Sequence, residues 1–127
     1  ADEPRAQIVG HFDLLTKFDE KEHFFDETSL RYRAAALDAM DTLVSAGKIF
    51  EVNTGAISRG WRTTPYPSRW VLEQLKRRNA QVTISSDSHG VGTVDCAFDR
   101  AKALLEACGF EEIRVFDGKT FAAQKIE

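Results

Sequence analysis

The sequence predicts an α/β fold in which parallel strands alternate with helices. Short apolar runs rich in β-branched residues recur along the chain, and longer segments with helical spacing separate them. Polar residues that can act as ligands follow the first three runs, as in parallel α/β folds, whose functional groups collect at the carboxyl ends of strands. The sequence has no fixed-period repeat, low-complexity tract or internal boundary. We therefore expect residues 1–127 to form a single α/β unit.

The first half of the chain predicts a strand, a helix and a second strand. Residues 6–11 (AQIVGH) are apolar and β-branched in the middle, which is typical of a buried strand. A helix is expected from an N-cap at Thr28 or Ser29 to Gly47, which stands where a helix-ending glycine belongs. Residues 48–55 (KIFEVNTG) predict the second strand and its turn. The expected apolar stripe of the helix comprises Leu30, Ala34, Leu37, Met40 (or Asp41) and Val44.

The second half of the chain repeats this alternation. A connection with two prolines (AISRGWRTTPYPSRW) leads to a helix over about 67–78, with Ser68 as its expected N-cap. Residues 80–90 (AQVTISSDSHG) predict a third strand and a turn, and a helix is expected over about 93–108. Residues 111–119 (EEIRVFDGK) predict a fourth strand in the same parallel sheet, and a short amphipathic tail follows.

The composition excludes several classes of protein. A net charge of -3 gives no reason to expect a nucleic-acid surface. The sequence shows no signal-peptide pattern, and no apolar run approaches the roughly 18 residues that cross a bilayer, so we expect no membrane partner. Cys96 and Cys108 match no metal or redox motif, which favours buried, reduced thiols in a cytoplasmic protein. The start ADEPR lacks an initiator Met, so we expect either a trimmed chain or the C-terminal piece of a longer protein.

Asp87 and His89, in the turn SSDSHG after the third strand, are candidate metal ligands. Carboxylate oxygen and neutral imidazole nitrogen suit Zn, Mn and Fe, and residues i and i+2 of an extended segment point to the same side. In the structural alternative, Ser86, Asp87 and Ser88 cap the next helix while His89 is solvated. His11 ends the first strand and is either a further ligand or a hydrogen-bonded interior residue.

Basic and aromatic residues follow the first two strands. Lys17 lies beyond HFDLL, and Arg59 and Arg62 lie in the loop after the second strand. Arg suits bidentate recognition of phosphate oxygens and Lys acts as a point charge, although both residues are also common in solvated loops. Trp61 and Tyr66 in the same loop are candidates to wall a pocket for a flat organic group.

The remaining polar residues and motifs point to no other chemistry. Asp13 is expected either to orient His11 or to solvate the strand end, and His23 is expected at the surface. The sequence contains no G-x-G-x-x-G after a strand, no Walker A motif and no G-x-S-x-G elbow. Both cysteines are expected on the helix over 93–108, at a spacing that indicates packing rather than catalysis.

Three segments in order resemble the C-terminal motifs of the PHP (polymerase and histidinol phosphatase) superfamily, and best resemble its histidinol-phosphate phosphatase branch. They are IVGHFDLLTKF, FEVNTGAISRG with PYPS, and VTISSDSHG, and the resemblance runs from about Gln7 to the end of the chain. It implies a distorted (β/α)7 barrel, of which this chain would be the C-terminal half, with up to three divalent metal ions at the carboxyl ends of the strands. That family opens with an H-x-H motif and this sequence contains none. The N-terminal strands are therefore expected outside this chain.

The resemblance also implies a role for each matching residue. Glu51 is expected either to support the metal ligands or to be purely structural, and Asp87 or His89 is expected to act in catalysis by relaying a proton. The implied ligands of the divalent metal ions (Zn, Mn or Fe) are His11, Asp87 and His89, and the implied substrate or phosphate-site residues are Lys17, Asn53 and Arg59.

The expected function is that of a metal-dependent phosphomonoesterase. The branch it resembles implies hydrolysis of the small phosphate ester L-histidinol phosphate to L-histidinol and phosphate, in histidine biosynthesis. This chain alone is expected to be inactive without its N-terminal part. Two alternatives stay open at this point: a related phosphoesterase acting on another phosphomonoester or nucleotide, and a non-catalytic fragment or interaction module that keeps part of the site.

Overall fold

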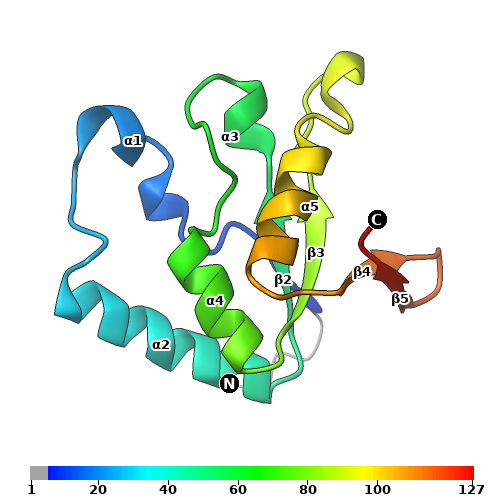
Figure 1. The fold of residues 1–127 in the computed structure, drawn as a ribbon, viewed down its shortest axis with the longest axis horizontal. Coiled ribbons are helices and arrows are strands. Elements are labelled where there is room, and N and C mark those ends of the chain that lie inside the picture. Colours follow the sequence, from blue (N-terminus) through cyan, green and yellow to red (C-terminus); the bar gives the residue numbers. More distant parts are fainter. Residues whose placement is uncertain (1–5) are drawn as a thin grey trace.

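The structure is a computed structural model that describes residues 6–127, so the first five residues of the expected unit lie outside the described residues. The described residues form a mixed α/β fold, which confirms the predicted class (Figure 1). The elements in chain order are β1 (Ile8–Val9), the 3₁₀ helix η1 (Leu14–Thr16), α1 (Asp19–Glu22), α2 (Leu30–Ser45), β2 (Ile49–Asn53), α3 (Gly55–Ser58), α4 (Arg69–Arg77), β3 (Gln81–Ser85), the 3₁₀ helix η2 (Val91–Thr93), α5 (Phe98–Ala107), β4 (Glu112–Phe116) and β5 (Phe121–Lys125).

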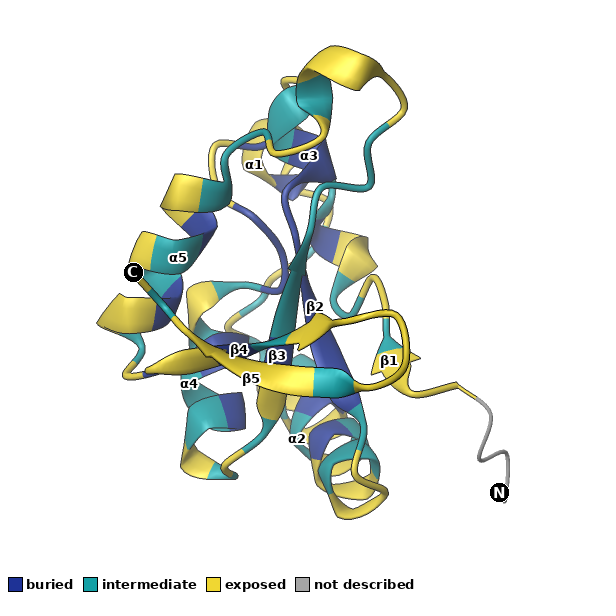
Figure 2. Ribbon diagram, turned by 90° about the vertical axis from the view of Figure 1, so that its right-hand side faces the viewer, coloured by how far each residue is buried: buried dark blue, intermediate teal, exposed yellow. Residues whose placement is uncertain are grey.

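Three parallel strands form the main sheet, in the order β1-β2-β3. Ile8 pairs with Ile49, and Ile49 pairs in turn with Gln81. The central strand β2 is buried along its whole length, whereas β1 is short and half-exposed (Figure 2). Because the strands are parallel and nearly in register, the residues that follow each strand emerge at the same edge of the sheet.

Helices α2, α4 and α5 pack against one face of this sheet. The contact is made by apolar side chains that alternate along the strands, as the period of two in a strand requires. The fully buried members of this core include Met40, Phe50, Val52, Val71, Leu72, Leu75, Ala101 and Leu105. The stripe predicted for α2 is partly wrong, because Leu30 at the start of the helix is 86% exposed, whereas Ala36 and Met40 are buried.

The boundaries of α2 and α4 confirm the predicted positions of their caps. Ser29 is the N-cap of α2, and its Oγ accepts a hydrogen bond from Tyr32 N at 3.2 Å. Gly47 follows the C-terminus of α2 with φ 71°, a left-handed conformation that glycine adopts without strain. Ser68 occupies the N-cap position of α4. The described residues contain no helix that is both long and apolar enough to cross a membrane.

The predicted fourth parallel strand is wrong. Strand β4 pairs antiparallel with β5, so the expected amphipathic tail is the second strand of a hairpin. A tight turn directs the chain back: Asp117 Oδ1 accepts hydrogen bonds from Lys119 N and Thr120 N, both at 2.9 Å, and Gly118 has φ 97°. Asp followed by Gly between two apolar runs is a hairpin signal. Strand β4 contacts β3 without joining the parallel sheet, so half of a closed barrel stays a prediction.

The helix predicted over 93–108 begins later, at Phe98. Ala97 has φ 59°, outside the helical region, and Thr93 Oγ1 bonds to Gly90 O at 2.9 Å in a separate turn. Cys96 therefore lies before α5, and Cys108 is its C-cap residue. Both cysteines are free and half-buried, rather than fully buried as expected.

Candidate functional site

The residues that follow β1, β2 and β3 meet at one edge of the sheet, the upper edge in Figure 1, beside α3. The loop after β1 contributes His11, and the turn after β3 contributes Asp87 and His89. Two of these residues adopt left-handed backbone conformations, with φ 55° at His11 and φ 46° at Asp87. Such conformations cost free energy in residues other than glycine, and here they direct both side chains toward the neighbouring strands.

Glu51 fixes the orientation of His11. Its Oε2 atom accepts a hydrogen bond from His11 N at 2.8 Å and lies 3.4 Å from His11 Nδ1. The Glu51 side chain is buried on the face of β2 opposite the helices, whereas the imidazole of His11 is 44% exposed. Because Glu51 lies beside Nδ1, the Nε2 atom of His11 faces the turn after β3. The expected supporting role of Glu51 thus has a direct geometric basis.

Asp87 is the centre of the cluster. Its Oδ2 atom lies 3.5 Å from His11 Nε2, and its Oδ1 atom lies 3.6 Å from His89 Nε2. Arg59 donates from Nη2 to the Asp87 backbone carbonyl at 2.7 Å, and to the carboxylate Oδ2 at 3.3 Å. The structure therefore brings together four of the residues predicted from the sequence: His11, Arg59, Asp87 and His89.

The charge state of Asp87 follows from these neighbours. Its partial burial on its own raises the pKa of the carboxyl group. The hydrogen bonds and positive charge of Arg59 oppose this effect, with smaller contributions from His11 and His89. The net result is that the pKa of Asp87 lies below the ordinary value for aspartate, so that the side chain is a carboxylate at neutral pH.

The donor types in this cluster suit a divalent metal ion, because two imidazole nitrogens and one carboxylate are common ligands of Zn, Mn and Fe. The two imidazoles face different oxygens of the Asp87 carboxylate. Among residues 6–127, however, no group of three or more His, Cys, Asp or Glu side chains has the arrangement that would hold a metal ion. The chain thus provides suitable donors for a metal site without the complete coordination geometry.

The close packing of the turn after β2 positions Arg59. Asn53 is fully buried, and its Oδ1 atom accepts a hydrogen bond from Gly55 N at 2.9 Å. A Cβ atom at position 55 would lie 2.9 Å from Arg59 Nη1 and 2.9 Å from the carbonyl oxygen of Ser86. Asn53, predicted at the substrate site, therefore supports the turn that carries Arg59. Its Nδ2 atom has no hydrogen-bond partner among the described residues.

Lys17 and Arg59 lie against the same indole ring. Lys17 Nζ is 4.2 Å from the centroid of the Trp61 ring, and Arg59 Cζ is 5.4 Å from it. Trp61 is half-buried, whereas Tyr66 is only 1% exposed. The expectation that Tyr66 helps to wall a ligand pocket is therefore wrong, since its ring packs in the interior beneath His11. The contact between Trp61 and the two cations was not predicted from the sequence.

Asp13 does not orient His11, contrary to one of the two expectations for it. Its carboxylate accepts hydrogen bonds from the Tyr32 hydroxyl and from Ser68 N. Burial raises the pKa of Asp13, and these hydrogen bonds and Arg62 only partly oppose that effect. Asp13 instead connects the loop after β1 to the N-termini of α2 and α4.

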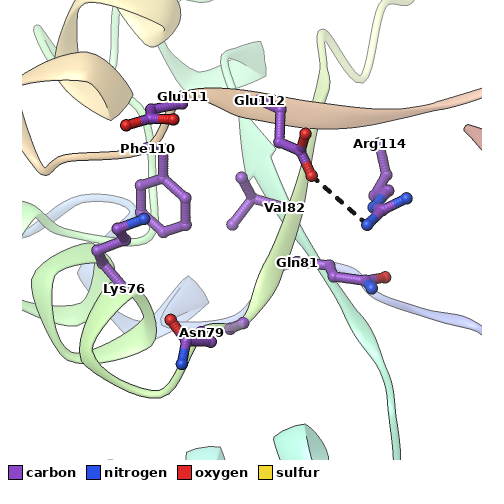
Figure 3. A pocket seen from close by; sticks show the side chains of 9 residues that line it. Lys76, Asn79, Gln81, Val82, Phe110, Glu111, Glu112 and Arg114 are labelled. Carbon is purple, nitrogen blue, oxygen red and sulfur yellow. Dashed lines mark ion pairs between the residues drawn. The ribbon is translucent and has the colours of Figure 1, made fainter. Parts of the chain in front are cut away.

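Three cavities among the described residues lie near the sheet, and two of them border the cluster, because His11 lines one and Glu51 lines another. A cavity of about 330 Å³ lies at the amino-terminal end of β3, lined by Lys76, Gln81, Phe110 and Glu111 among others (Figure 3). Its Arg114 is already paired with Glu112 at 3.5 Å. Two larger hollows, of about 650 and 620 Å³, flank β1 and the face of the sheet that carries Glu51.

The fold and the site together define a class of protein: an α/β chain that gathers His, Asp and Arg side chains at the carboxyl ends of parallel strands. Comparison with known proteins adds a particular similarity. The chain is 38% identical over 109 residues to a probable histidinol-phosphatase of Schizosaccharomyces pombe (strain 972), a match that covers 84% of this chain and 35% of that protein. It is 25% identical over 104 residues to a histidinol-phosphatase of Bacillus subtilis (strain 168), covering 82% and 37%.

The chain thus spans about a third of the length of the curated relatives it matches. No family model matches the sequence. Similarity to histidinol-phosphatases is therefore a finding, and the expected PHP superfamily stays a prediction.

Proposed function

We propose that this chain is part of a metal-dependent phosphomonoesterase that hydrolyses L-histidinol phosphate. One observation carries the proposal: His11, Arg59, Asp87 and His89 come from three separate loops and meet at one edge of the sheet. The similarity to two proteins named as histidinol-phosphatases agrees with this choice of substrate. In this proposal the chain is the C-terminal half of a (β/α)7 barrel that acts in histidine biosynthesis in the cytoplasm.

His11, Asp87 and His89 would hold the metal. Zinc sites in proteins take at least four ligands, and catalytic sites reserve one of them for water or substrate. His11, Asp87 and His89 would match the three protein ligands of one such ion, and a cluster of up to three ions would take further ligands from the rest of the protein. A divalent metal bound there would supply a hydroxide at neutral pH and neutralise phosphate charge. The matched segments cover only 35% and 37% of the two relatives, which leaves ample sequence for further ligands.

The chain's own residues would bind the ester and assist the leaving group. A phosphate monoester dianion needs cations around its equatorial oxygens, and Arg59 and Lys17 both lie at this edge of the sheet. A guanidinium has five N–H donors, so Arg59 can bind phosphate while it keeps its hydrogen bonds to Asp87. The leaving alkoxide needs a proton. Asp87, a carboxylate at neutral pH, or His89 would accept one from the attacking water and pass it to the alkoxide.

The proposal is tested on the full-length protein with a phosphate-release assay over a panel of phosphomonoesters. We expect histidinol phosphate to be hydrolysed best, and elemental analysis to find Zn, Mn or Fe. Preference for another phosphomonoester or a nucleotide would instead support the related phosphoesterase. If the protein bound no metal and hydrolysed no phosphomonoester, the proposal would be refuted. The non-catalytic interaction module would then be the remaining interpretation.

Two histidines offer a matched comparison. His89→Ala should lower kcat/KM by at least about 100-fold, because second-sphere changes at metal sites already cost 10–100-fold and His89 is proposed as a direct ligand. His23→Ala should change it less than about twofold, because His23 is exposed at the end of α1 and surface substitutions of this kind are nearly neutral. Similar losses in both variants would show that the ligand is misassigned.

A further inference from the structure

Trp61 has an unusual set of neighbours. Two cationic side chains, Lys17 and Arg59, lie within cation–π distance of its ring, at 4.2 and 5.4 Å from the centroid. Phe18 packs edge-on against the same ring, with the centroids 5.3 Å apart. The two cations come from different loops, and both contact the indole of Trp61.

Hydrogen bonds hold these two loops together around Trp61. Arg62 is buried and donates from Nη1 to the Thr16 carbonyl at 2.6 Å. Lys21 donates from Nζ to the Gly60 carbonyl at 2.6 Å. Thr63 donates from its backbone N–H to Glu20 at 2.8 Å. These hydrogen bonds involve residues on both sides of Lys17 and on both sides of Trp61, so they attach the two segments to each other around the indole.

Arg59 connects this arrangement to the proposed metal ligands. Its guanidinium donates to Asp87 and lies in the space that the absence of a side chain at Gly55 leaves open. A continuous series of contacts thus runs from Asp87 through Arg59 and Trp61 to Lys17.

Two like charges near one ring repel each other, and a lysine side chain loses rotamer freedom when it is held in place. The indole π face offsets both costs, because its quadrupole attracts each cation. Without it, Lys17 would be free to turn into solvent. A dianion placed between the two side chains would gain from both charges at once, Arg as a fork and Lys as a point charge.

We propose that Trp61 is a positioning residue that holds Lys17 beside Arg59, so that the two side chains form a two-cation site for the phosphate group of the substrate. This inference rests on the proposed function. Nothing in the similarity to histidinol-phosphatases assigns a role to this tryptophan. Trp61 acts through the two cations and takes no part in bond making or breaking.

The first test measures steady-state kinetics of the full-length protein with histidinol phosphate. Trp61→Leu should raise KM and the inhibition constant for inorganic phosphate about tenfold, with kcat changed less than about threefold. Trp61→Phe should lie between this variant and the wild type, because a smaller π face attracts cations less strongly. The matched control is Trp70→Phe, which removes an indole that lies 4.8 Å from Arg33 elsewhere in the chain and should change neither constant.

A double-mutant cycle separates positioning from general damage to the fold. Lys17→Gln should raise KM on its own, and Trp61→Leu should then add only the part that acts through Arg59. The fold increase in KM of the double variant should therefore be smaller than the product of the fold increases of the two single variants. Fully multiplicative effects, or an equal fall in kcat and kcat/KM in Trp61→Leu, would overturn the proposal.

A spectroscopic readout requires no turnover. The sequence has two tryptophans, so Trp70→Phe leaves Trp61 as the single indole of this chain. In a protein whose other tryptophans are also replaced by phenylalanine, inorganic phosphate should change the Trp61 fluorescence saturably, and Lys17→Gln should weaken that response. If the wild type hydrolyses no phosphomonoester, the proposed function fails. If it is active but its KM, phosphate inhibition and fluorescence are indifferent to these changes, the role of Trp61 alone is refuted.

Discussion

Gly55→Ala should disturb the candidate site through steric contact alone. The new Cβ would lie 2.9 Å from Arg59 Nη1, 2.9 Å from the Ser86 carbonyl oxygen and 3.0 Å from Asn53 Oδ1. The guanidinium can move aside cheaply because it ends a flexible side chain. The Ser86 carbonyl cannot, because it belongs to the backbone that leads directly into Asp87. The substitution therefore shifts the β3 turn, displaces Arg59, or does both.

The size of the effect follows from two opposing terms. Overpacking a well-packed site typically costs about 1–3 kcal/mol. Replacing glycine by alanine at a compatible backbone position stabilises the folded state by about 0.4–1 kcal/mol, because it lowers the conformational entropy of the unfolded chain. The free energy of unfolding should thus fall by about 1–2 kcal/mol. Displacement of Arg59 from Asp87 should lower kcat/KM for histidinol phosphate by at least about tenfold, since hydrogen bonds to charged groups contribute about 1.5–3 kcal/mol.

Gly92 provides the matched control, because a Cβ there would meet nothing within 4 Å and its φ is not in the left-handed region. Gly92→Ala should leave stability unchanged or raise it by up to about 1 kcal/mol. Urea denaturation of both variants measures the free energy of unfolding, and steady-state kinetics measures kcat/KM. If Gly55→Ala proved as stable and as active as Gly92→Ala, the close packing around Arg59 would be refuted as the basis of the site.

Two further predictions concern the loops around the site. Glu51→Ala should lower kcat/KM more than tenfold and Glu51→Gln much less, because Gln still presents an oxygen to His11 N and Ala does not; equal losses would show that the carboxylate has another role. Burial alone would raise the pKa of Glu20, but hydrogen bonds from Thr63 and Thr64 and the charge of Arg62 hold it below the ordinary value of 4.5. The stability from Glu20 is therefore present above that value and lost as the pH falls through the lower, folded-state pKa. The difference in unfolding free energy between wild type and Glu20→Gln should shrink on acidification, and a constant difference would contradict this.

Much of the fold could be predicted from the sequence because local signals and tertiary packing agree. The Ser29 side chain caps α2, and Gly47 stands where a left-handed backbone is needed. Ser68 holds the predicted N-cap position of α4, although its side chain makes no capping hydrogen bond. The prediction that the fourth strand joins the parallel sheet was wrong for a specific reason. Its apolar pattern is that of a strand in either orientation, and only the Asp117–Gly118 turn distinguishes a hairpin from a parallel crossover.

The placement of the candidate ligands at one edge of the sheet could be predicted because it depends on topology, whereas their mutual contacts depend on backbone detail. Parallel strands bring their carboxyl ends together, so His11, Asp87 and His89 were expected at one edge. The contact between Trp61 and the two cations arises from loop packing, which has no periodicity in the sequence. The sequence shows Arg59 two positions before Trp61 in a loop that contains glycine. This spacing does not indicate which side chains the indole contacts.

Two of the candidate ligands, His11 and Asp87, have left-handed backbone conformations. Left-handed φ values at His11 and Asp87 cost of order 1–3 kcal/mol each, so the surrounding structure must hold them. It does so at both positions with a side-chain acceptor for the backbone N–H: Glu51 for His11 at 2.8 Å, and Ser85 Oγ for Asp87 at 3.2 Å. Both acceptors belong to the parallel sheet. The sheet therefore does more than bring the strand ends together, because its own side chains hold the backbone in the strained conformation that directs His11 and Asp87 toward each other.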